Sequence, residues 1–269
     1  MIGSYTTDPH GGTVTYWEML AVFAAGIGAG TINTIVGSGT LITFPVLLAT
    51  GLPPVTATVS NALGLIPGSI SGAIGYRAEL TGQRDRVLRL AVAAAVGGLG
   101  GAILLTVLPP TAFETIVPVL VALALVLVIF QPRITRAVQA RRERDGRTDA
   151  PQHGGPLLFT GMLLASVYGG YFTAAQGIIY LSLMGMLIDD SLQRLNATKN
   201  ILAAVVNTIA ALFFVFAADF DWTAVALIAV GSTIGGQLGA RVGRRLPAKA
   251  LRALIVVIGS AAIIQLVTR

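Results

Sequence analysis

The stretch GAGTINTIVGSG, residues 28–39, places glycines and hydroxyl side chains inside an otherwise apolar segment. Glycine and serine at this density predict that a helix is interrupted there, which frees backbone amides. In hydrocarbon such groups must be bonded, so irregular backbone is tolerated only against protein or a watery cavity. The stretch therefore predicts a polar site inside a membrane-embedded helical protein. The alternative is that these small residues only let helices pack closely.

The composition around this stretch is that of a membrane protein. Of the 269 residues, 54% are hydrophobic and 11% are charged, whereas a soluble domain has about 25% charged residues. Apolar runs of about 20 residues, the length that crosses a bilayer core, recur along the chain. The net charge of +6 does not gather beside aromatic residues on one soluble face, so we expect a lipid bilayer and no nucleic acid as partner.

Apolar segments between polar interruptions form two sets of five. The first set is 17–36, 41–49, 55–76, 87–108 and 116–130, and the second is 157–176, 178–188, 201–218, 222–240 and 250–267. The segments 41–49 and 178–188 are short for an upright crossing, so the fold class is an all-α polytopic membrane protein of about 8 to 10 transmembrane or half-membrane helices. The predicted domains are a polar tail (1–16), a first repeat (17–131), an Arg-rich cytoplasmic linker (132–155) and a second repeat (156–269).

The two sets read as an internal duplication. An offset of 139 residues superposes Gly30 on Gly169, Asn61 on Asn200, Gly97 on Gly236, Leu99 on Leu238 and Gly100 on Gly239. The order and spacing of the segments repeat as well, which gives sharper support than identities among small residues.

Basic loops give the orientation, because short loops rich in Lys and Arg are retained in the cytoplasm. Lys and Arg gather at 77–89, 133–147 and 241–252, and none occurs at 51–54, 109–114 or 219–221. This pattern predicts a multi-pass protein of the cell membrane with its basic loops in the cytoplasm and its two repeats in opposite orientation. Inverted repeats of this kind are typical of secondary transporters.

Polar residues within or beside the spans are the candidates for substrate binding. Lys199 is the most informative, because an ionisable side chain next to a span is a functional candidate; the alternative is a side chain that snorkels to the cytoplasmic interface. A functional Lys199 would supply positive charge for an anion, helped by helix N-termini. The full predicted set is Asn33, Gly37, Ser38, Gly39, Thr58, Ser60, Asn61, Gly169, Gly170, Gln176, Thr198, Lys199, Asn200 and Asn207.

Other chemistries lack their motifs. The chain has no cysteine, and we find no P-loop, no zinc-binding His-Glu-x-x-His and no Gly-x-Ser-x-Gly elbow. We therefore expect no enzyme, no metal and no cofactor, and transport driven by a gradient with a proton or sodium as coupling ion. An anion channel and a membrane scaffold without flux are the rival functions, and a homodimer stays open as a partner.

Several of these motifs resemble the TauE/SafE family, also called the sulfite exporter family. The resemblance covers almost the whole chain and is most specific in the second half, where the family's probable-transporter subgroup is matched. The matching motifs are GIGAG (26–30), GSG (37–39), Pro45, GLPP (51–54), ATVSN (57–61), NATKN (196–200), Asn207 and GQLGARVG (236–243). The resemblance implies export of a small sulfur-containing anion, such as sulfite or an organosulfonate.

Overall fold

The computed structural model describes residues 6–7, 13–145 and 155–242 and the single positions 253, 256, 257 and 260. The predicted segment 250–267 and the linker residues 146–154 thus lie wholly or largely outside the described residues. In chain order the elements are β1 (Thr6–Thr7), β2 (Thr13–Val14), α1 (Tyr16–Ile35), α2 (Thr40–Ala49), α3 (Pro54–Gly64), α4 (Ile66–Gly75), α5 (Arg84–Val107), α6 (Pro110–Asp145), α7 (Pro156–Phe172), α8 (Gln176–Leu187), α9 (Leu192–Ala217) and α10 (Trp222–Val242). The two short strands pair antiparallel, with Thr6 opposite Val14.

The described helices have the lengths and surfaces of membrane spans. Helices α1, α5, α9 and α10 and the Thr111–Phe130 part of α6 are long and apolar enough to cross a bilayer, while α2, α7 and α8 are apolar but shorter. Large apolar side chains such as Trp17, Leu164 and Phe216 are more than half exposed, which suits contact with lipid. The chain is an all-helical, multi-pass membrane protein apart from its two short strands.

One segment that reads as a single run, 55–76, is divided in the structure. Helix α3 ends at Gly64 and α4 begins at Ile66. Pro67 causes the division, because its nitrogen has no hydrogen to donate to the carbonyl of Leu63 and its ring crowds that carbonyl.

Two other helices are longer than their apolar segments. Helix α6 continues to Asp145, through the first part of the predicted linker, because Arg, Gln and Glu favour helix as strongly as Leu does. Helix α9 begins nine residues before Ile201, at Leu192, where the Ser191 side chain caps it by accepting the Arg194 N–H. The first turns of α9 are therefore helical although their side chains are mostly polar.

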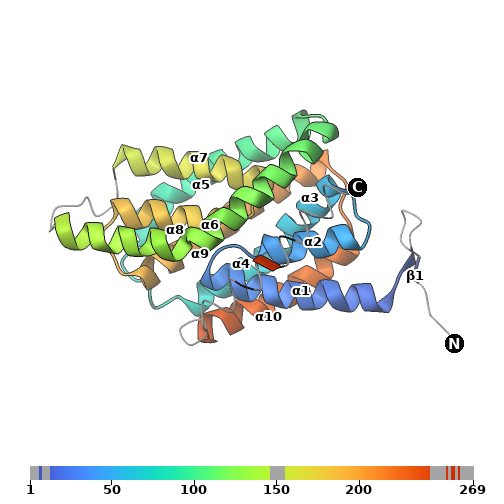
Figure 1. The fold of residues 1–269 in the computed structure, drawn as a ribbon, viewed down its shortest axis with the longest axis horizontal. Coiled ribbons are helices and arrows are strands. Elements are labelled where there is room, and N and C mark those ends of the chain that lie inside the picture. The colour runs from blue at the N-terminus through green and yellow to red at the C-terminus, as the bar shows by residue number, and fades with distance from the viewer. Residues whose placement is uncertain are drawn as a thin grey trace.

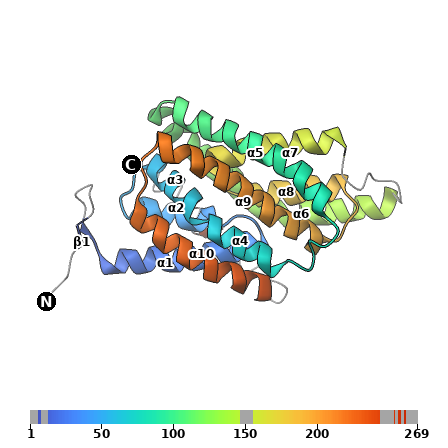
Figure 2. The same cartoon turned by 180° about the vertical axis from the view of Figure 1, so that it is seen from behind.

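The two halves of the chain interlock. The most extensive helix contacts join α1 of the first half to α10 of the second, and α5 of the first half to α7 of the second (Figure 1, Figure 2). Glycines allow the close approach: a Cβ on Gly30 or Gly235 of the first pair, or on Gly101 of the second, would overlap with backbone of the facing helix. Gly100 on α5, by contrast, has only ordinary contacts.

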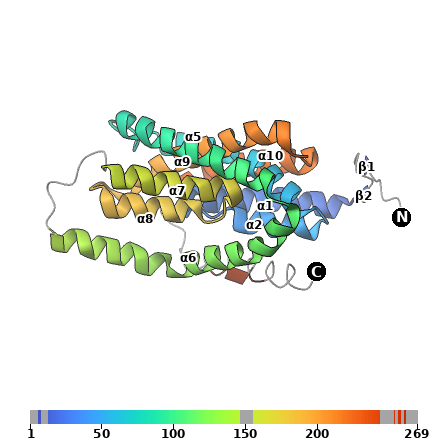
Figure 3. The same ribbon diagram turned by 90° about the horizontal axis from the view of Figure 1, so that it is seen from above.

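The shorter helices lie inside this frame and α6 lies outside it. Helix α8 packs between α7 and α9 and also contacts α6, which runs along the outer side of the bundle in the view from above (Figure 3). The rings of Phe44 in α2 and Phe172 in α7 meet edge to face with centroids 5.3 Å apart. Both belong to the largest buried apolar cluster, which surrounds the ends of the interrupted helices.

Candidate functional site

The first break lies between α1 and α2, at residues 36–39. Gly37 has φ +85°, a left-handed conformation that glycine adopts without steric cost. Gly39 precedes α2 and sits against the carbonyl of Ala29, where a Cβ would overlap. The predicted interruption of the first segment is therefore confirmed, and Gly37 and Gly39 are required by backbone geometry.

The second break lies between α7 and α8, at residues 173–175. Thr173 has φ 63° and Ala175 has φ 56°, so two residues with side chains hold a conformation that strains them. The break is fixed by the Tyr168 hydroxyl, which donates to the Ala174 carbonyl at 2.7 Å, and by the Thr173 hydroxyl, which donates to the Gly169 carbonyl at 2.9 Å. Strained backbone that the surroundings enforce is a feature of functional sites.

The two breaks meet in the middle of the bundle. The backbone N–H of Gly177, in the first turn of α8, donates to the carbonyl of Gly37 at 3.1 Å. The two glycines lie backbone against backbone, so a Cβ on either would overlap with the other. We call this contact, with the breaks 36–39 and 173–175, the crossing.

Lys199 of α9 reaches the crossing and is fully buried. Its Nζ donates to the Asn33 carbonyl at 2.7 Å and to the Thr34 carbonyl at 3.2 Å. The Asn196 amide also donates to the Thr34 carbonyl, at 3.0 Å. These carbonyls end α1, where the helix dipole is negative and favours a cation. The side chain does not snorkel to an interface, and its amine lies at the end of an interrupted helix.

Both polar atoms of the Asn61 side chain, in α3, have hydroxyl partners on α2. Its Nδ2 donates to the Thr40 hydroxyl at 3.1 Å, and its Oδ1 accepts from the Thr43 hydroxyl. All three side chains are buried. The amide therefore fixes α3 to the first turns of α2, directly after the first break.

Gln176, the first residue of α8, uses only part of its bonding capacity. Its Nε2 donates to the Tyr180 hydroxyl at 2.6 Å, which pairs with Ser166, and the Ser166 hydroxyl donates to the Met162 carbonyl at 2.6 Å. A Cβ on Gly169 would overlap with the Gln176 side chain, so that predicted glycine makes room for the amide. The Gln176 Oε1 remains without a partner in the described structure.

Other buried polar atoms share this property. Within the described residues, the buried side-chain atoms without a hydrogen-bond partner are Thr34 Oγ1, Ser38 Oγ, Tyr171 OH, Gln176 Oε1, Asn196 Oδ1, Asn200 Nδ2, and Asn207 Oδ1 and Nδ2. Each such atom costs about 1 to 3 kcal/mol if it stays unbonded, and folded proteins keep few of them. Four of these residues, Ser38, Gln176, Asn196 and Asn200, lie in a break or within one turn of Gln176 or Lys199 along their helices, and Thr34 lies two residues before the first break.

The remaining predicted residues bond elsewhere. The Thr58 hydroxyl donates to Pro54 of its own helix, the Ser60 hydroxyl accepts the Asp221 N–H at the start of α10, and Gly170 packs on Gly98. The Asn33 side chain donates to the Ser69 hydroxyl at 3.2 Å. The crossing thus brings together only part of the predicted set.

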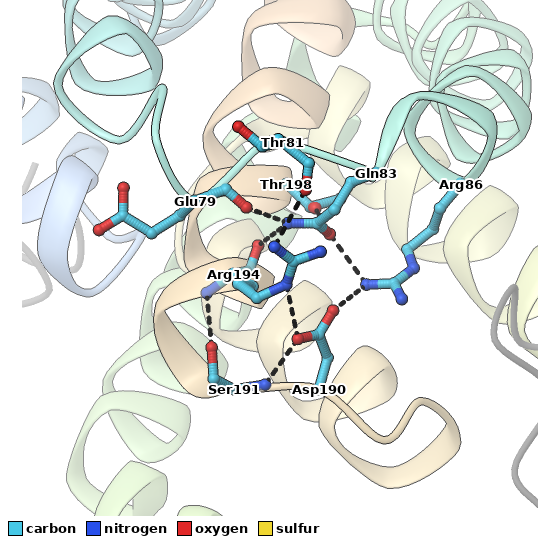
Figure 4. Close-up of polar contacts among 8 residues, drawn as sticks. All are labelled: Glu79, Thr81, Gln83, Arg86, Asp190, Ser191, Arg194 and Thr198. Atoms are coloured by element: carbon cyan, nitrogen blue, oxygen red, sulfur yellow. Dashed lines mark hydrogen bonds and ion pairs between the residues drawn. The ribbon is translucent and has the colours of Figure 1, made fainter.

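Thr198 belongs to a second polar centre that the sequence did not predict (Figure 4). Its hydroxyl donates to Gln83 Oε1 at 2.9 Å, and Gln83 Nε2 donates to the Arg194 carbonyl at 3.2 Å. Asp190 accepts from Arg86 Nη1 at 2.6 Å and from Arg194 Nε at 2.8 Å. We call these five residues the polar network; it joins the start of α5 in the first half to the α8–α9 turn in the second.

Burial and neighbouring hydrogen-bond donors determine the protonation state of Asp190. Burial alone would raise the pKa of its carboxyl, but hydrogen bonds from Arg86, Arg194 and the Ser191 N–H together hold that pKa below its usual value. Asp190 is therefore a carboxylate at neutral pH. The spacing of Asp190 and Arg194 by four residues was a signal in the sequence, but their partners Gln83 and Arg86 are distant in the chain.

A metal site is not formed by the part of the chain that the structure describes. No group of three or more His, Cys, Asp or Glu side chains comes together there. What the arrangement offers is backbone and amide groups beside one buried lysine amine, which suits the binding of a small ion.

Comparisons with known proteins place these features in a family. The model of the family described as "Sulfite exporter TauE/SafE" matches residues 22–266. The probable membrane transporter protein YfcA of Escherichia coli K12 is 27% identical over 240 residues, which cover 89% of this chain and 86% of that protein. The probable membrane transporter protein ORF9 of a Sinorhizobium species is 28% identical over 248 residues, covering 91% and 90%. One from Haemophilus influenzae is 26% identical over 229 residues, covering 83% and 85%.

Proposed function

Because this chain belongs to the sulfite exporter TauE/SafE family, we propose that it is a secondary membrane transporter that exports a small anion, such as sulfite or an organosulfonate. The observation that carries the proposal is the crossing. Two interrupted helices from different halves of the chain meet there beside the buried Lys199. Interrupted helices that meet inside a bundle are the usual substrate sites of secondary transporters.

The halves are related as inverted repeats. Three features support this. Helix α1 of the first half packs along α10 of the second, and α7 of the second half packs along α5 of the first. Helices α1 and α7 are each followed by a break and a short helix, and identities at an offset of 139 residues match the two halves. Two such halves can exchange conformations, which opens a central site to each side in turn.

The anion binds at the second break in this proposal. Helix α8 starts there without a side-chain cap, so its positive end faces the crossing. Asn200 Nδ2, next to Lys199, is a buried donor without a partner among the described residues. An anion that accepts from it satisfies a donor whose burial would otherwise be costly. Asn207 lies about 10 Å farther along α9, beyond the reach of the same small anion.

The polar network closes one side of the transporter. Its ion pair of Arg86 with Asp190 and its bond between Gln83 and Thr198 hold α5 of the first half to α9 of the second. Opening toward that side separates these groups. Thr198 directly precedes Lys199, so movement of the network shifts the residue that holds the end of α1.

The network faces the cytoplasm, because it lies beside the basic loop that contains Arg77 and Arg84, and short basic loops are retained inside. The protein resides in the cell membrane and couples export to a proton or sodium gradient. Such coupling makes flux saturable and dependent on the gradient.

Reconstituted flux tests this proposal. Purified protein in liposomes is loaded with sulfite or methanesulfonate, and efflux is recorded with and without a proton or sodium gradient. The expected result is saturable efflux that an opposing gradient slows. Conductance that rises linearly with anion concentration would identify a channel. If liposomes with and without the protein release both anions at the same rate, the protein would instead be a scaffold without flux.

A further inference from the structure

An apolar groove runs along the outside of the bundle between α4 and α9. It encloses about 460 Å³ and is lined by Ile70, Ala73 and Ile74 on one side and by Ile201, Val205 and Ile209 on the other, with Arg77 as its charged residue. Ile70 and Ile74 are about half exposed. A hollow of this size has the volume of a small-molecule site, but almost all its walls are hydrocarbon.

The groove has the length of one bilayer leaflet. Its wall on α9 extends from Ile201 to Ile209, which at 1.5 Å per residue is roughly 12 Å. The hydrocarbon of one leaflet is about 15 Å thick, half of the core. An extended acyl chain fits this geometry, whereas the walls offer a small polar solute little beyond the side chains of Thr208 and Arg77.

Arg77 lies at the outer end of the groove. It follows the last turn of α4 and precedes the turn whose Thr81 carbonyl and Gln83 side chain bond to Arg194, in the first turn of α9. Arg77 is exposed and has no side-chain ion pair with any residue that the structure describes. The groove therefore starts at a free guanidinium and runs toward the bilayer centre.

We propose that this groove binds an anionic phospholipid, with one acyl chain between α4 and α9 and the phosphate on Arg77. A guanidinium matches the geometry of a phosphate and binds it by two parallel hydrogen bonds. The basic side of the protein faces the leaflet that is rich in anionic lipids, and basic pockets between helices on that side bind their headgroups. The occupant touches both halves of the chain, since α4 belongs to the first and α9 to the second.

A second copy of the chain fits the groove less well. The Arg77 charge would need an acidic partner, and the residues that line the groove include no Asp or Glu. A specific protein interface also buries about 1,200 Å² or more, which a groove for a single chain does not supply. The lipid proposal requires no transport, but it rests on the cytoplasmic orientation of the basic loops proposed above.

Native mass spectrometry of the purified full chain tests the proposal. The protein is mixed with equal amounts of phosphatidylglycerol and phosphatidylcholine that carry the same acyl chains. Wild type should retain phosphatidylglycerol about fivefold over phosphatidylcholine, the preference expected from one basic residue at the surface. Arg77→Gln should abolish the preference, and Ala73→Phe, which fills the groove, should abolish retention of both lipids. Thermal melting confirms that each variant is folded.

Arg89→Gln is the matched control, because Arg89 is an exposed arginine of the same basic region that does not line the groove. It should retain the wild-type preference. The proposal is overturned if Arg77→Gln keeps the preference, or if Arg89→Gln loses as much of it. Dimers that Ala73→Phe converts to monomers would also overturn it, because they would assign the groove to a second copy.

Discussion

The two breaks occupy matching places in the two halves but differ in how they are satisfied. At the first break the unusual backbone angle falls on Gly37, and at the second it falls on Thr173 and Ala175, which carry side chains. Both side-chain polar atoms of Asn61, beside the first break, have hydrogen-bond partners, in Thr40 and Thr43. Its counterpart at the offset of 139 residues, Asn200, has an Nδ2 without a partner among the described residues.

The residues at matching positions explain the difference. The short helices begin at Thr40 and at Gln176, so Thr40 and Thr43 correspond to Gln176 and Ile179, and the Gln176 amide donates to Tyr180 of its own helix at 2.6 Å. The second half therefore has an amide without a local partner and backbone strain that glycine would relieve. We infer that the first break is a scaffold and that the second break is the one that changes partners when substrate binds.

The largest expected effect comes from closing the crossing with a methyl group. Gly37→Ala places a Cβ into Gly177 at a left-handed backbone angle, so we expect a loss of about 3 kcal/mol of stability and no measurable flux. Gly28→Ala on the same helix meets only ordinary contacts at 3.8 Å and beyond. Thermal melting and reconstituted efflux of both variants check this. Equal melting temperatures would show that the close contact at the crossing does not constrain the fold.

A somewhat smaller loss is expected for Lys199→Met. The variant has an unbranched side chain one atom shorter than lysine and leaves the Asn33 carbonyl without its donor, which costs about 1 to 3 kcal/mol. Efflux should fall at least tenfold, because the end of α1 loses both of its hydrogen bonds to Lys199 and is held less firmly to the second half. Wild-type efflux from a folded Lys199→Met protein would show that this contact has no part in transport.

Acid weakens the polar network in the next prediction. Because the folded protein holds the pKa of Asp190 below its usual value, the network's contribution is present at neutral pH. It is lost as the pH falls below about 4, the usual value for this group. Asp190→Asn should lower the melting temperature at pH 7 and converge with wild type in acid. The exposed neighbour Asp189 supplies the control, since the melting temperature of Asp189→Asn should follow that of wild type at every pH. If Asp190→Asn also follows wild type at every pH, the polar network does not stabilise the fold.

The smallest effect concerns strain at the second break. Ala174→Gly and Ala175→Gly each delete one buried methyl group, but only Ala175 has a positive φ. Ala175→Gly should therefore be more stable than Ala174→Gly by about 1 to 2 kcal/mol. Chemical denaturation in detergent measures the difference. If Ala174→Gly is the more stable variant, the second break is not strained at Ala175.

Much of the fold could be predicted from the sequence, because the bilayer imposes a length on apolar segments. The first break was predicted from the glycine-rich stretch at residues 28–39, since freed backbone in hydrocarbon needs partners. The helix ends were less accurate at α6 and α9. Charged residues such as Arg133 and Arg194 ended the apolar runs, but helices end where caps and backbone geometry end them.

The site was only partly predictable, because contacts between distant segments decide it. Lys199 was singled out by its place beside a span, but that its Nζ meets the end of α1 depends on how the halves interlock. Thr198 was expected at the same site, yet it points to Gln83, because adjacent residues on a helix face about 100° apart. Gln83 and Arg86 lay in a basic loop and gave no separate signal.

The comparison of Asn61 with Asn200 gives the most direct test of the central claim. Leucine, similar in size to asparagine, replaces each, and both melting temperature and its shift with added sulfite or methanesulfonate are measured. We expect Asn61→Leu to melt lower, because Thr40 and Thr43 lose their partner, and to keep the anion-induced shift. Asn200→Leu should melt as wild type does and lose the shift. A full anion-induced shift in Asn200→Leu would contradict the account.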